Sequence, residues 1–513
     1  EKCNYKLRDK SGTTIGARMG RPEKAKIRKL TGSPQILLSV GNEGGKTRSF
    51  NNALAKGKIN SDFPNFFCGT CNRETIYSLC ETCGNKCVIK FYCITCKKIG
   101  DKEECCGRKT LKSRKREIDI NHYLKSALKI LDTNSYPELI KGVRGTSSNG
   151  HIVEHLAKGI LRAKYGLYVN KDGTIRYDMT EMPLTHFRPR EICLSLDKLK
   201  KLGYEKDIYG NLIETDEQII ELKCQDIVIP CSPDTLDERC DDILIKITRF
   251  IDELLEKLYK TEKYYNLKTK EDLIGQLVVS LSPHTSSGIV CRVIGFSKTQ
   301  GLLAHPYLHC LMRRDADGDE SCIMLLMDML LNFSKKYLPS TRGATQDEPL
   351  LLSAKLLPTE VDDMAFDIDV CFNYPLEFYE GALQYKNPSE IKISKVKDFL
   401  DTEKQYEGFG FTHDTSDINR GVVCSAYKSI PSMVEKVKGQ LDLAKKIRAV
   451  VEQDVARLVV EKHFIRDIKG NLRKFSTQQF RCVQCNAKFR RPPLSGICLE
   501  CGGKLLFTVA EGF

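Results

Sequence analysis

Closely spaced cysteine pairs are the feature that most constrains how this chain can fold. Many of its 23 cysteines lie in Cys-x-x-Cys pairs, in a large sequence that does not open with a signal-peptide pattern. Disulfides would be expected in a secreted protein, whereas this spacing favours zinc, because each pair wraps one edge of a tetrahedral ion. Two pairs joined by a short hairpin close one site, so metal coordination would determine the local backbone structure.

The pairs predict three zinc modules with a structural role or a role in bracing nucleic acid. The first site is expected to use Cys68, Cys71, Cys80 and Cys83. The third is expected to use Cys482, Cys485, Cys498 and Cys501. The second site is ambiguous, and we expect Cys93 and Cys96 with two further thiolates, Cys105 and Cys106 or, as an alternative to one of them, Cys87.

The acidic loop at residues 313–320 is the second constrained stretch, because Asp315, Asp317 and Asp319 alternate around Gly318. Side chains two residues apart lie on the same side of an extended backbone, so these carboxylates can converge. Gly318 lets the loop bend where other residues would strain. Hard oxygen ligands in this arrangement suit Mg²⁺, and two such ions can activate an attacking oxygen and stabilise a leaving one.

Other interpretations of this loop compete with a magnesium site. An acidic loop is most often a solvated turn. A calcium EF-hand is disfavoured, because Glu320 and Leu326 stand where that motif needs a glycine and a bidentate glutamate. The histidines and the cysteine at residues 305–310 match no usual spacing of zinc ligands. Arg313 and Arg314, immediately before the acids, favour phosphate handling.

The charge balance fits a polyanionic partner. Lys and Arg number 81 against 67 acids, a formal net charge of +14. In the basic segment at residues 16–26, Arg21, Lys24 and Lys26 could line a phosphate or nucleotide site, or else begin a solvated helix. No run of about 18 apolar residues occurs, so we expect no membrane partner and a cytoplasmic protein. Because the sequence starts with Glu1, we expect a piece of something larger.

Hydrophobic periodicity predicts a mixed α+β fold. Helical patterns are expected over residues 113–165, 247–258, 322–337 and 432–463. Strands are expected at 35–40, 275–282 and 288–294, and Asp172-Gly173 predicts a hairpin turn within 169–175. The acidic loop would then follow two strands and precede a helix, as an insertion in a β-barrel.

Six short motifs are spread in order across nearly the whole chain: Gly16-Ala-Arg-Met-Gly-Arg-Pro-Glu-Lys-Ala25, Thr185-His-Phe-x-Pro-Arg-Glu191, Leu281-x-Pro-His-Thr-Ser286, His305-Pro-Tyr307, Arg313-Arg-x-x-Asp-Gly-Asp-Glu320 and Arg490-Arg-Pro-Pro-Leu494. Each is modest alone. Together they resemble the large subunit of the archaeal D-family DNA polymerase, and the part covered looks like its carboxy-terminal catalytic portion.

The resemblance implies a core of two double-psi β-barrels with inserted helical regions and three zinc-ribbon modules. Part of the first barrel is expected at 1–57, two cysteine modules at 58–112, a helical accessory region at 113–182, and an α+β segment that could return to the first barrel at 183–242. The second barrel with the acidic loop would occupy 243–425, a helical region 426–475 and the C-terminal ribbon 476–513.

The resemblance also implies site residues. Asp317 and Asp319 would be the metal-binding catalytic aspartates, and Lys24 and Lys26 would face them from the partner barrel and contact the incoming triphosphate. The family usually has asparagine at the position of Asp315, so whether Asp315 is a third ligand stays open. The implied activity is extension of a primer 3′-hydroxyl with dNTPs on a DNA template, in DNA replication.

The implied cofactors are two Mg²⁺ and three Zn²⁺, and the implied partners are primer–template DNA, dNTPs, a small proofreading exonuclease subunit and a sliding clamp. Two alternatives stay open. The Asp-x-Asp-Gly-Asp pattern also resembles the loop of RNA polymerases of the double-psi barrel superfamily. The second alternative is a catalytically inactive, zinc-rich subunit for DNA binding or assembly.

Overall fold

The computed structural model describes residues 33–314, 318–410, 417–420, 429–447, 450–483 and 487–507. The chain divides into two compact units, of which one comprises Ile27–Cys424 and the other includes Ser425–Phe513. Six predicted site residues lie outside the described residues, and their roles stay predictions: Arg21, Lys24, Lys26, Asp315, Asp317 and Cys485. None of the helices that the structure describes is long and apolar enough to cross a membrane.

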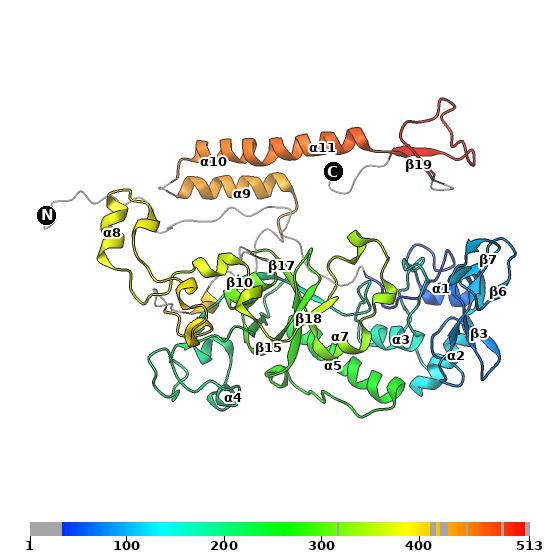
Figure 1. The fold of residues 1–513 in the computed structure, drawn as a ribbon, viewed down its shortest axis with the longest axis horizontal. Helices are drawn as coiled ribbons and strands as arrows, with labels where there is room; N and C mark the ends of the chain where they lie inside the picture. Colours follow the sequence, from blue (N-terminus) through cyan, green and yellow to red (C-terminus); the bar gives the residue numbers. More distant parts are fainter. Residues whose placement is uncertain are drawn as a thin grey trace. The chain divides into compact units, whose positions relative to one another are not determined.

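A closed six-stranded β-barrel forms the core of the Ile27–Cys424 unit (Figure 1). Its strands follow the order β13-β16-β10-β17-β14-β15, and a parallel pairing of β13 with β15 closes the ring. β10 and β16 are also parallel, and the other neighbours are antiparallel. The strands are β10 (Tyr177–Pro183), β13 (Asp226–Pro230), β14 (Leu277–Leu281), β15 (Ser287–Ser297), β16 (Leu302–Ala304) and β17 (Glu320–Leu325), and β18 (Leu351–Ser353) pairs with β15 beside the ring.

Continuous burial explains why these segments become barrel strands. Every residue of β13 is buried, as are most residues of β15, and their β-branched side chains suit a pleated, packed surface. The pairing of β13 with β15 shifts between Ile227 and Val228, which leaves Ile294 as an extra residue in β15. Such a bulge bends the strand that carries it and increases its twist. The strands predicted at 275–282 and 288–294 are confirmed. β10 and β13 precede residue 243, so the barrel takes strands from earlier in the chain than the range 243–425.

Helices cover the barrel. α5 (Cys240–Leu254) buries the apolar face predicted for it and contacts β13, β17, α3 (Leu156–Lys164) and α7 (Leu326–Asn332). The helix predicted over 322–337 is wrong at its start, because Glu320–Leu325 forms β17. The rest of the range contains α7 and a 3₁₀ turn at Lys335–Tyr337. A short, fully buried apolar run fits a strand as well as a helix, so its periodicity did not separate them.

The part of this unit before the barrel is built on a two-stranded stem. β1 (Lys58–Pro64) and β9 (Ser113–Asp119) pair antiparallel over seven residue pairs, flanked by α1 (Phe50–Ala55) and α2 (Ile120–Leu131). The helical pattern expected from residue 113 therefore begins later, at α2. The strand predicted at 35–40 is buried but forms one bridge only, between Ser39 and Val143.

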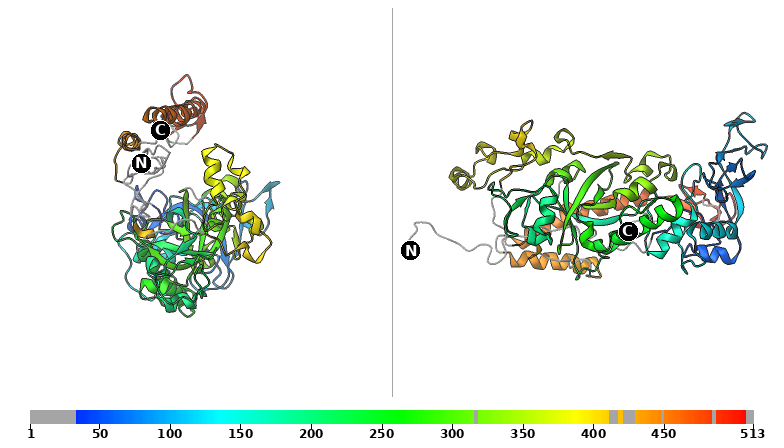
Figure 2. Two further views of the ribbon diagram at one scale, coloured as in Figure 1. Left: turned by 90° about the vertical axis from the view of Figure 1, so that its left-hand side faces the viewer. Right: turned by 90° about the horizontal axis from the view of Figure 1, so that it is seen from below.

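The cysteine-rich segment between β1 and β9 extends from the end of this stem as small hairpins (Figures 1 and 2). Because the stem brings residues 64 and 113 together, the modules form an insertion that leaves the rest of the unit continuous. Their strands are β2 (Phe66–Cys68), β3 (Arg73–Thr75), β4 (Val88–Ile89), β5 (Phe91–Tyr92), β6 (Ile99–Gly100), β7 (Glu104–Cys105) and β8 (Arg108–Lys109).

Smaller elements complete the unit. β11 (His186–Phe187), β12 (Ile220–Glu221) and α4 (Leu196–Lys201) enclose a separate apolar cluster against β13 and β16. α6 (Pro306–Leu311) leads to the acidic loop, and short 3₁₀ turns with α8 (Leu376–Leu383) follow β18.

The unit that includes Ser425–Phe513 is elongated helices followed by a small sheet. α9 (Met433–Lys446) contacts α10 (Glu452–Leu458), and a π-helical turn joins α10 to α11 (Ile465–Thr477). The sheet has the order β20-β19-β21, formed by β19 (Phe480–Cys482), β20 (Lys488–Phe489) and β21 (Leu505–Phe507). The helical region predicted at 432–463 thus continues to Thr477.

Candidate active site and thiolate clusters

The acidic loop lies between α6 and β17, so both of its ends are held by regular structure. His305 caps α6 by accepting the Tyr307 N–H at Nδ1, 3.1 Å away, and Pro306 supplies the fixed φ that a first helical residue needs. After Leu311 the chain turns through Arg313, whose φ is +61°. Gly318 has a φ of +98°, which a residue with a Cβ adopts only under strain.

Asp319 is the predicted catalytic aspartate that the structure describes. Its carbonyl oxygen accepts the Glu181 N–H of β10 at 3.0 Å, which extends the β10–β17 ladder by one bond and attaches the loop to the barrel. Its carboxylate Oδ2 lies 3.3 Å from the Arg314 guanidinium, and 22% of the side chain is exposed. A partly exposed oxygen donor at the rim of a barrel fits Mg²⁺, which prefers carboxylate and water ligands.

The Arg314 side chain is largely buried and makes two contacts. Its guanidinium donates to the Pro283 carbonyl in the turn between β14 and β15 and also pairs with Asp319. Arg313 differs, because its side chain is 60% exposed and lies 3.5 Å from Asp362. The structure thus brings Arg314 to Asp319 and leaves Arg313 facing solvent.

Glu181 is an acid near this site that the sequence did not reveal. Its side chain is almost completely buried, and its Oε1 accepts from the Ser282 hydroxyl at 3.3 Å. It lies within β10, far from the loop in sequence, and no local motif marks it. Only the strand pairing that sets Thr180 against Glu320 would have pointed to it.

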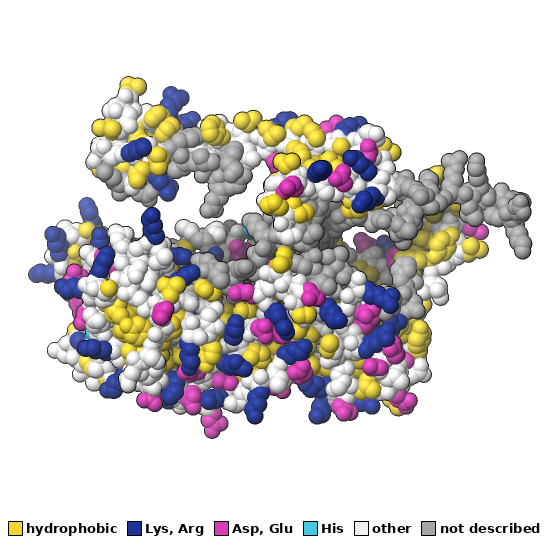
Figure 3. Space-filling view, turned by 180° about the vertical axis from the view of Figure 1, so that it is seen from behind, with side chains coloured by type: hydrophobic (Ala, Val, Ile, Leu, Met, Phe, Trp, Pro, Cys, Tyr) yellow, Lys and Arg dark blue, Asp and Glu magenta, His cyan; other side chains and the backbone are white. Residues whose placement is uncertain are grey.

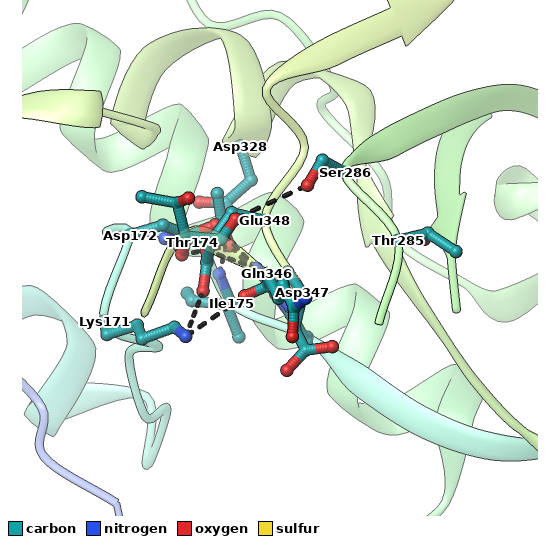
Figure 4. Close-up of polar contacts among 12 residues, drawn as sticks. Lys171, Asp172, Thr174, Ile175, Thr285, Ser286, Asp328, Gln346, Asp347 and Glu348 are labelled. Carbon is teal, nitrogen blue, oxygen red and sulfur yellow. Dashed lines mark hydrogen bonds and ion pairs between the residues drawn. The ribbon is translucent and has the colours of Figure 1, made fainter. Parts of the chain in front are cut away.

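A second group of acids is buried beside the turn at residues 283–286, and Figure 4 draws Asp172 and Glu348 to the left of Thr285 and Ser286. Arg176 donates to the Asp172 carboxylate at 2.7 Å and to the Glu348 carboxylate at 2.9 Å. Burial, followed by the charge of Asp172, raises the pKa of Glu348 to about 8. The pKa of Asp172 is lowered, because Arg176 and hydrogen-bond donors outweigh its burial.

The first four-cysteine set converges as predicted. The sulfurs of Cys68, Cys71, Cys80 and Cys83 all lie within 4.8 Å of one another. Cys68 and Cys83 are 3.6 Å apart, and Cys71 and Cys80 are 3.9 Å apart. A tetrahedral ion with metal–sulfur bonds of about 2.3 Å separates its sulfurs by about 3.8 Å, so the donors fit.

The second set consists of Cys93, Cys96, Cys105 and Cys106, again within 4.8 Å. The adjacent pair can share one centre because Cys106 has a φ of +52°, which turns the backbone between the two side chains. Cys87 instead packs with Phe66, Cys68 and Cys80 in the core of the first module. The described geometry therefore favours Cys105 and Cys106 over Cys87.

In the third module, Cys482, Cys498 and Cys501 converge, and the sulfurs of Cys482 and Cys501 lie 3.4 Å apart. The fourth predicted cysteine of this set lies outside the described residues. The three sets could hold metal ions, each on a hairpin too small to bury a core of its own.

Among the described residues, lysine and arginine side chains are spread over the face drawn in Figure 3 and are mixed with acids rather than forming one continuous basic patch. The excess of cations therefore does not by itself mark a nucleic-acid track on this face.

Comparison with known proteins places the chain in a family. Residues 133–436, more than half of the chain, match the model of the DNA polymerase II large subunit DP2 catalytic domain, and residues 1–102 match that of its central domain. Curated relatives named DNA polymerase II large subunit are 46% identical in Archaeoglobus fulgidus over 98% of this chain, 46% in Methanococcoides burtonii over 100%, and 45% in Pyrococcus furiosus over 100%.

The chain spans less than half of the length of these relatives, between 41% and 45%. The matched catalytic domain contains the barrel, Arg314 and Asp319. The family that the six motifs predicted is thus confirmed, and the chain belongs to the DNA polymerase II large subunit (DP2) family.

Proposed function

We propose that this chain carries the catalytic centre of a DNA-templated DNA polymerase, which extends a primer 3′-hydroxyl with dNTPs in DNA replication, and that it corresponds to the carboxy-terminal catalytic portion of the large subunit. The observation that carries the proposal is Asp319, fixed by a backbone bond to β10 at the barrel rim and paired with Arg314, inside the matched catalytic domain.

Asp317 and Asp319 would hold two Mg²⁺, with Asp315 as a candidate third ligand. Bound there, Mg²⁺ would lower the pKa of the primer hydroxyl and stabilise the pyrophosphate leaving group. Arg314 orients the Asp319 carboxylate through its two contacts. Arg313, whose guanidinium is exposed, is proposed as a phosphate contact, and Arg21, Lys24 and Lys26 are proposed as further ones.

We also propose that the chain contains two double-psi β-barrels. The closed barrel mixes parallel and antiparallel neighbours, which supports a double-psi topology, and a second barrel would be built from residues 1–57 with part of 183–242. We also propose the remaining domain ranges that the resemblance implies, from the cysteine modules at 58–112 to the C-terminal ribbon at 476–513. Zn²⁺ is the proposed ion for the three cysteine sets, with Cys485 completing the third, because four thiolates at this spacing suit it best.

The proposed partners are primer–template DNA, dNTPs, a small proofreading exonuclease subunit and a sliding clamp, in a cytoplasmic, nucleoid-associated assembly. The relatives are named as a large subunit, which supports a smaller partner. Base pairing with the template would select the nucleotide, so the protein's contacts to DNA would be mainly to the backbone and would weaken with salt.

The test is primer extension by the complete large subunit assembled with its small subunit. Asp319→Asn and the double variant Asp317→Asn with Asp319→Asn should lose extension by several orders of magnitude, whereas Asp363→Asn, at an exposed acid, should not. Undiminished extension by the double variant would support an inactive assembly subunit. Incorporation of NTPs in place of dNTPs on the same template would support an RNA polymerase.

A further inference from the structure

Three non-glycine residues in the left-handed backbone conformation lie at the start of the acidic loop or in the two segments beside it. Their φ angles are +64° at His284, +61° at Arg313 and +67° at Asp347. Such a conformation costs a non-glycine residue of order 1–3 kcal/mol and persists only where surrounding contacts impose it. Strain of this kind is concentrated at functional sites, so the contacts that impose it here are informative.

Asp347 is joined to the turn that contains His284 by two hydrogen bonds. Its carboxylate Oδ1 accepts the His284 N–H, and its own N–H donates to the Thr285 carbonyl at 3.0 Å. Ser286 is tied to the same segment, because its carbonyl accepts the Leu351 N–H at 3.0 Å. The turn between β14 and β15 is thus clamped by the segment at residues 346–351.

This turn reaches the candidate site through Arg314. The Pro283 carbonyl, immediately before His284, accepts from the Arg314 guanidinium. The same guanidinium lies 3.3 Å from the Asp319 carboxylate. A shift of the turn would therefore move the group that orients Asp319.

The clamp itself rests on a buried support (Figure 4). Arg176 donates to the Asp347 carbonyl at 2.6 Å and pairs with the carboxylates of Asp172 and Glu348. Lys171 donates to the Gln346 carbonyl at 3.2 Å. Arg176 immediately precedes β10, the strand whose Glu181 N–H holds Asp319, so both ends of the chain of contacts are fixed to one strand.

We propose that Asp347 is a positioning residue of the polymerase site: by clamping the turn at residues 283–286, it holds Arg314 where Arg314 orients Asp319. This inference rests on the proposed function. Asp347 touches neither substrate nor metal in it, and its effect should appear mainly in how well the aspartates hold a divalent cation.

Two substitutions at one position separate the clamp from general stability. Asp347→Asn keeps an oxygen that can accept the His284 N–H, whereas Asp347→Ala removes the acceptor. A third substitution, His284→Gly, provides a background in which residue 284 needs no clamp, because glycine adopts the left-handed conformation freely. Glu360→Ala, at an exposed acid, serves as the control for loss of one surface charge.

The first readout is the Mg²⁺ dependence of primer extension by the complete large subunit with its small subunit. Asp347→Ala should raise the Mg²⁺ concentration for half-maximal extension about fivefold, the size expected for losing one hydrogen bond. Asp347→Asn and Glu360→Ala should stay within about twofold of the wild type. In the His284→Gly background, Asp347→Ala should change the Mg²⁺ dependence by less than about twofold.

The second readout needs no activity. Amide hydrogen exchange should be faster in Asp347→Ala than in the wild type for peptides covering residues 283–287 and 312–320, with unchanged exchange in β13 and α5. Binding of Mn²⁺ to the DNA-free protein, followed by electron paramagnetic resonance, should weaken in parallel.

The outcomes distinguish this inference from the proposed function. If Asp347→Ala extends primers with the Mg²⁺ dependence and the amide exchange of the wild type, the inference is overturned and the proposed function is not. An equal rise of the half-maximal Mg²⁺ concentration in Asp347→Asn and Asp347→Ala would also overturn it, since a general packing defect does not depend on a hydrogen-bond acceptor at residue 347. So would an effect of Asp347→Ala that is equally large in the His284→Gly background. A wild-type assembly that extends no primer would overturn the proposed function, while the exchange experiment would still decide whether the clamp exists.

Discussion

Replacing Glu348 by glutamine should make this protein more stable at alkaline pH. The Glu348 carboxyl is fully buried, 3.0 Å from Lys171 and 2.9 Å from Arg176, and it also faces the carboxylate of Asp172. Burial raises its pKa to about 8 from the ordinary value of 4.5. The protonated carboxyl can donate a hydrogen bond to Asp172, and the amide group of glutamine can replace that donor.

The sign follows from proton linkage. Between about pH 4.5 and 8 the folded state holds a proton on Glu348 that the unfolded state releases, so this stabilisation is complete below pH 4.5 and is lost as pH rises through 8. A shift of that size corresponds to about 5 kcal/mol. The lowered pKa of Asp172 acts in the opposite direction, but only below its ordinary value of 3.8.

The assay is urea unfolding at pH 5, 7 and 9, followed by circular dichroism. Glu348→Gln should match the wild type at pH 5 and exceed its free energy of unfolding by roughly 3–5 kcal/mol at pH 9. Glu360→Gln, at an exposed position, should show no such trend. A Glu348→Gln difference that is the same at every pH would refute the shared proton.

Three further changes test other parts of the structure. Cys106→Ser should reduce the bound metal by one ion per chain and Cys87→Ser should not, as elemental analysis would show. The reason is that Cys106 belongs to the second thiolate cluster, whereas Cys87 packs in the core beside the first cluster. Arg162→Met should lower the unfolding free energy by about 3–5 kcal/mol in a urea titration, because it leaves the fully buried Glu154 carboxylate without the cation 2.8 Å away. Gly318→Ala should reduce primer extension at least about tenfold while thermal unfolding changes little, because a Cβ opposes the φ of +98° beside Asp319.

Local patterns were enough to predict the features that depend on neighbours in sequence. The first cysteine set closes within 16 residues, Cys68 to Cys83, and its spacing alone identified its members. The second set needed the backbone conformation of Cys106, which spacing does not reveal. β14 and β15 were predicted from their apolar composition, whereas β17 was mistaken for helix because its run is buried on both faces.

Contacts between distant segments could not be predicted in the same way. Asp347 meets His284 across 63 residues of sequence, and Arg176 meets Glu348 across 172. Asp347 and Glu348 look like two more surface acids in a polar loop, and only the closure of the barrel buries one and aims the other at a strained turn. A buried charge needs partners to be tolerated, and the sequence alone does not show which acids are buried and paired.

The barrel also decides where Asp319 lies. β17 pairs with β10 on one edge and with β14 on the other, setting Ile323 against Tyr177 and Ser280, so its register is fixed twice. Side chains alternate along a strand, and a slip by one residue would exchange the faces of Ile323 and Met324 and place a different residue opposite Glu181. The position of the candidate catalytic carboxylate is thus a consequence of core packing several residues away. Substitutions in the interior of β17 should accordingly impair the site before they unfold the barrel.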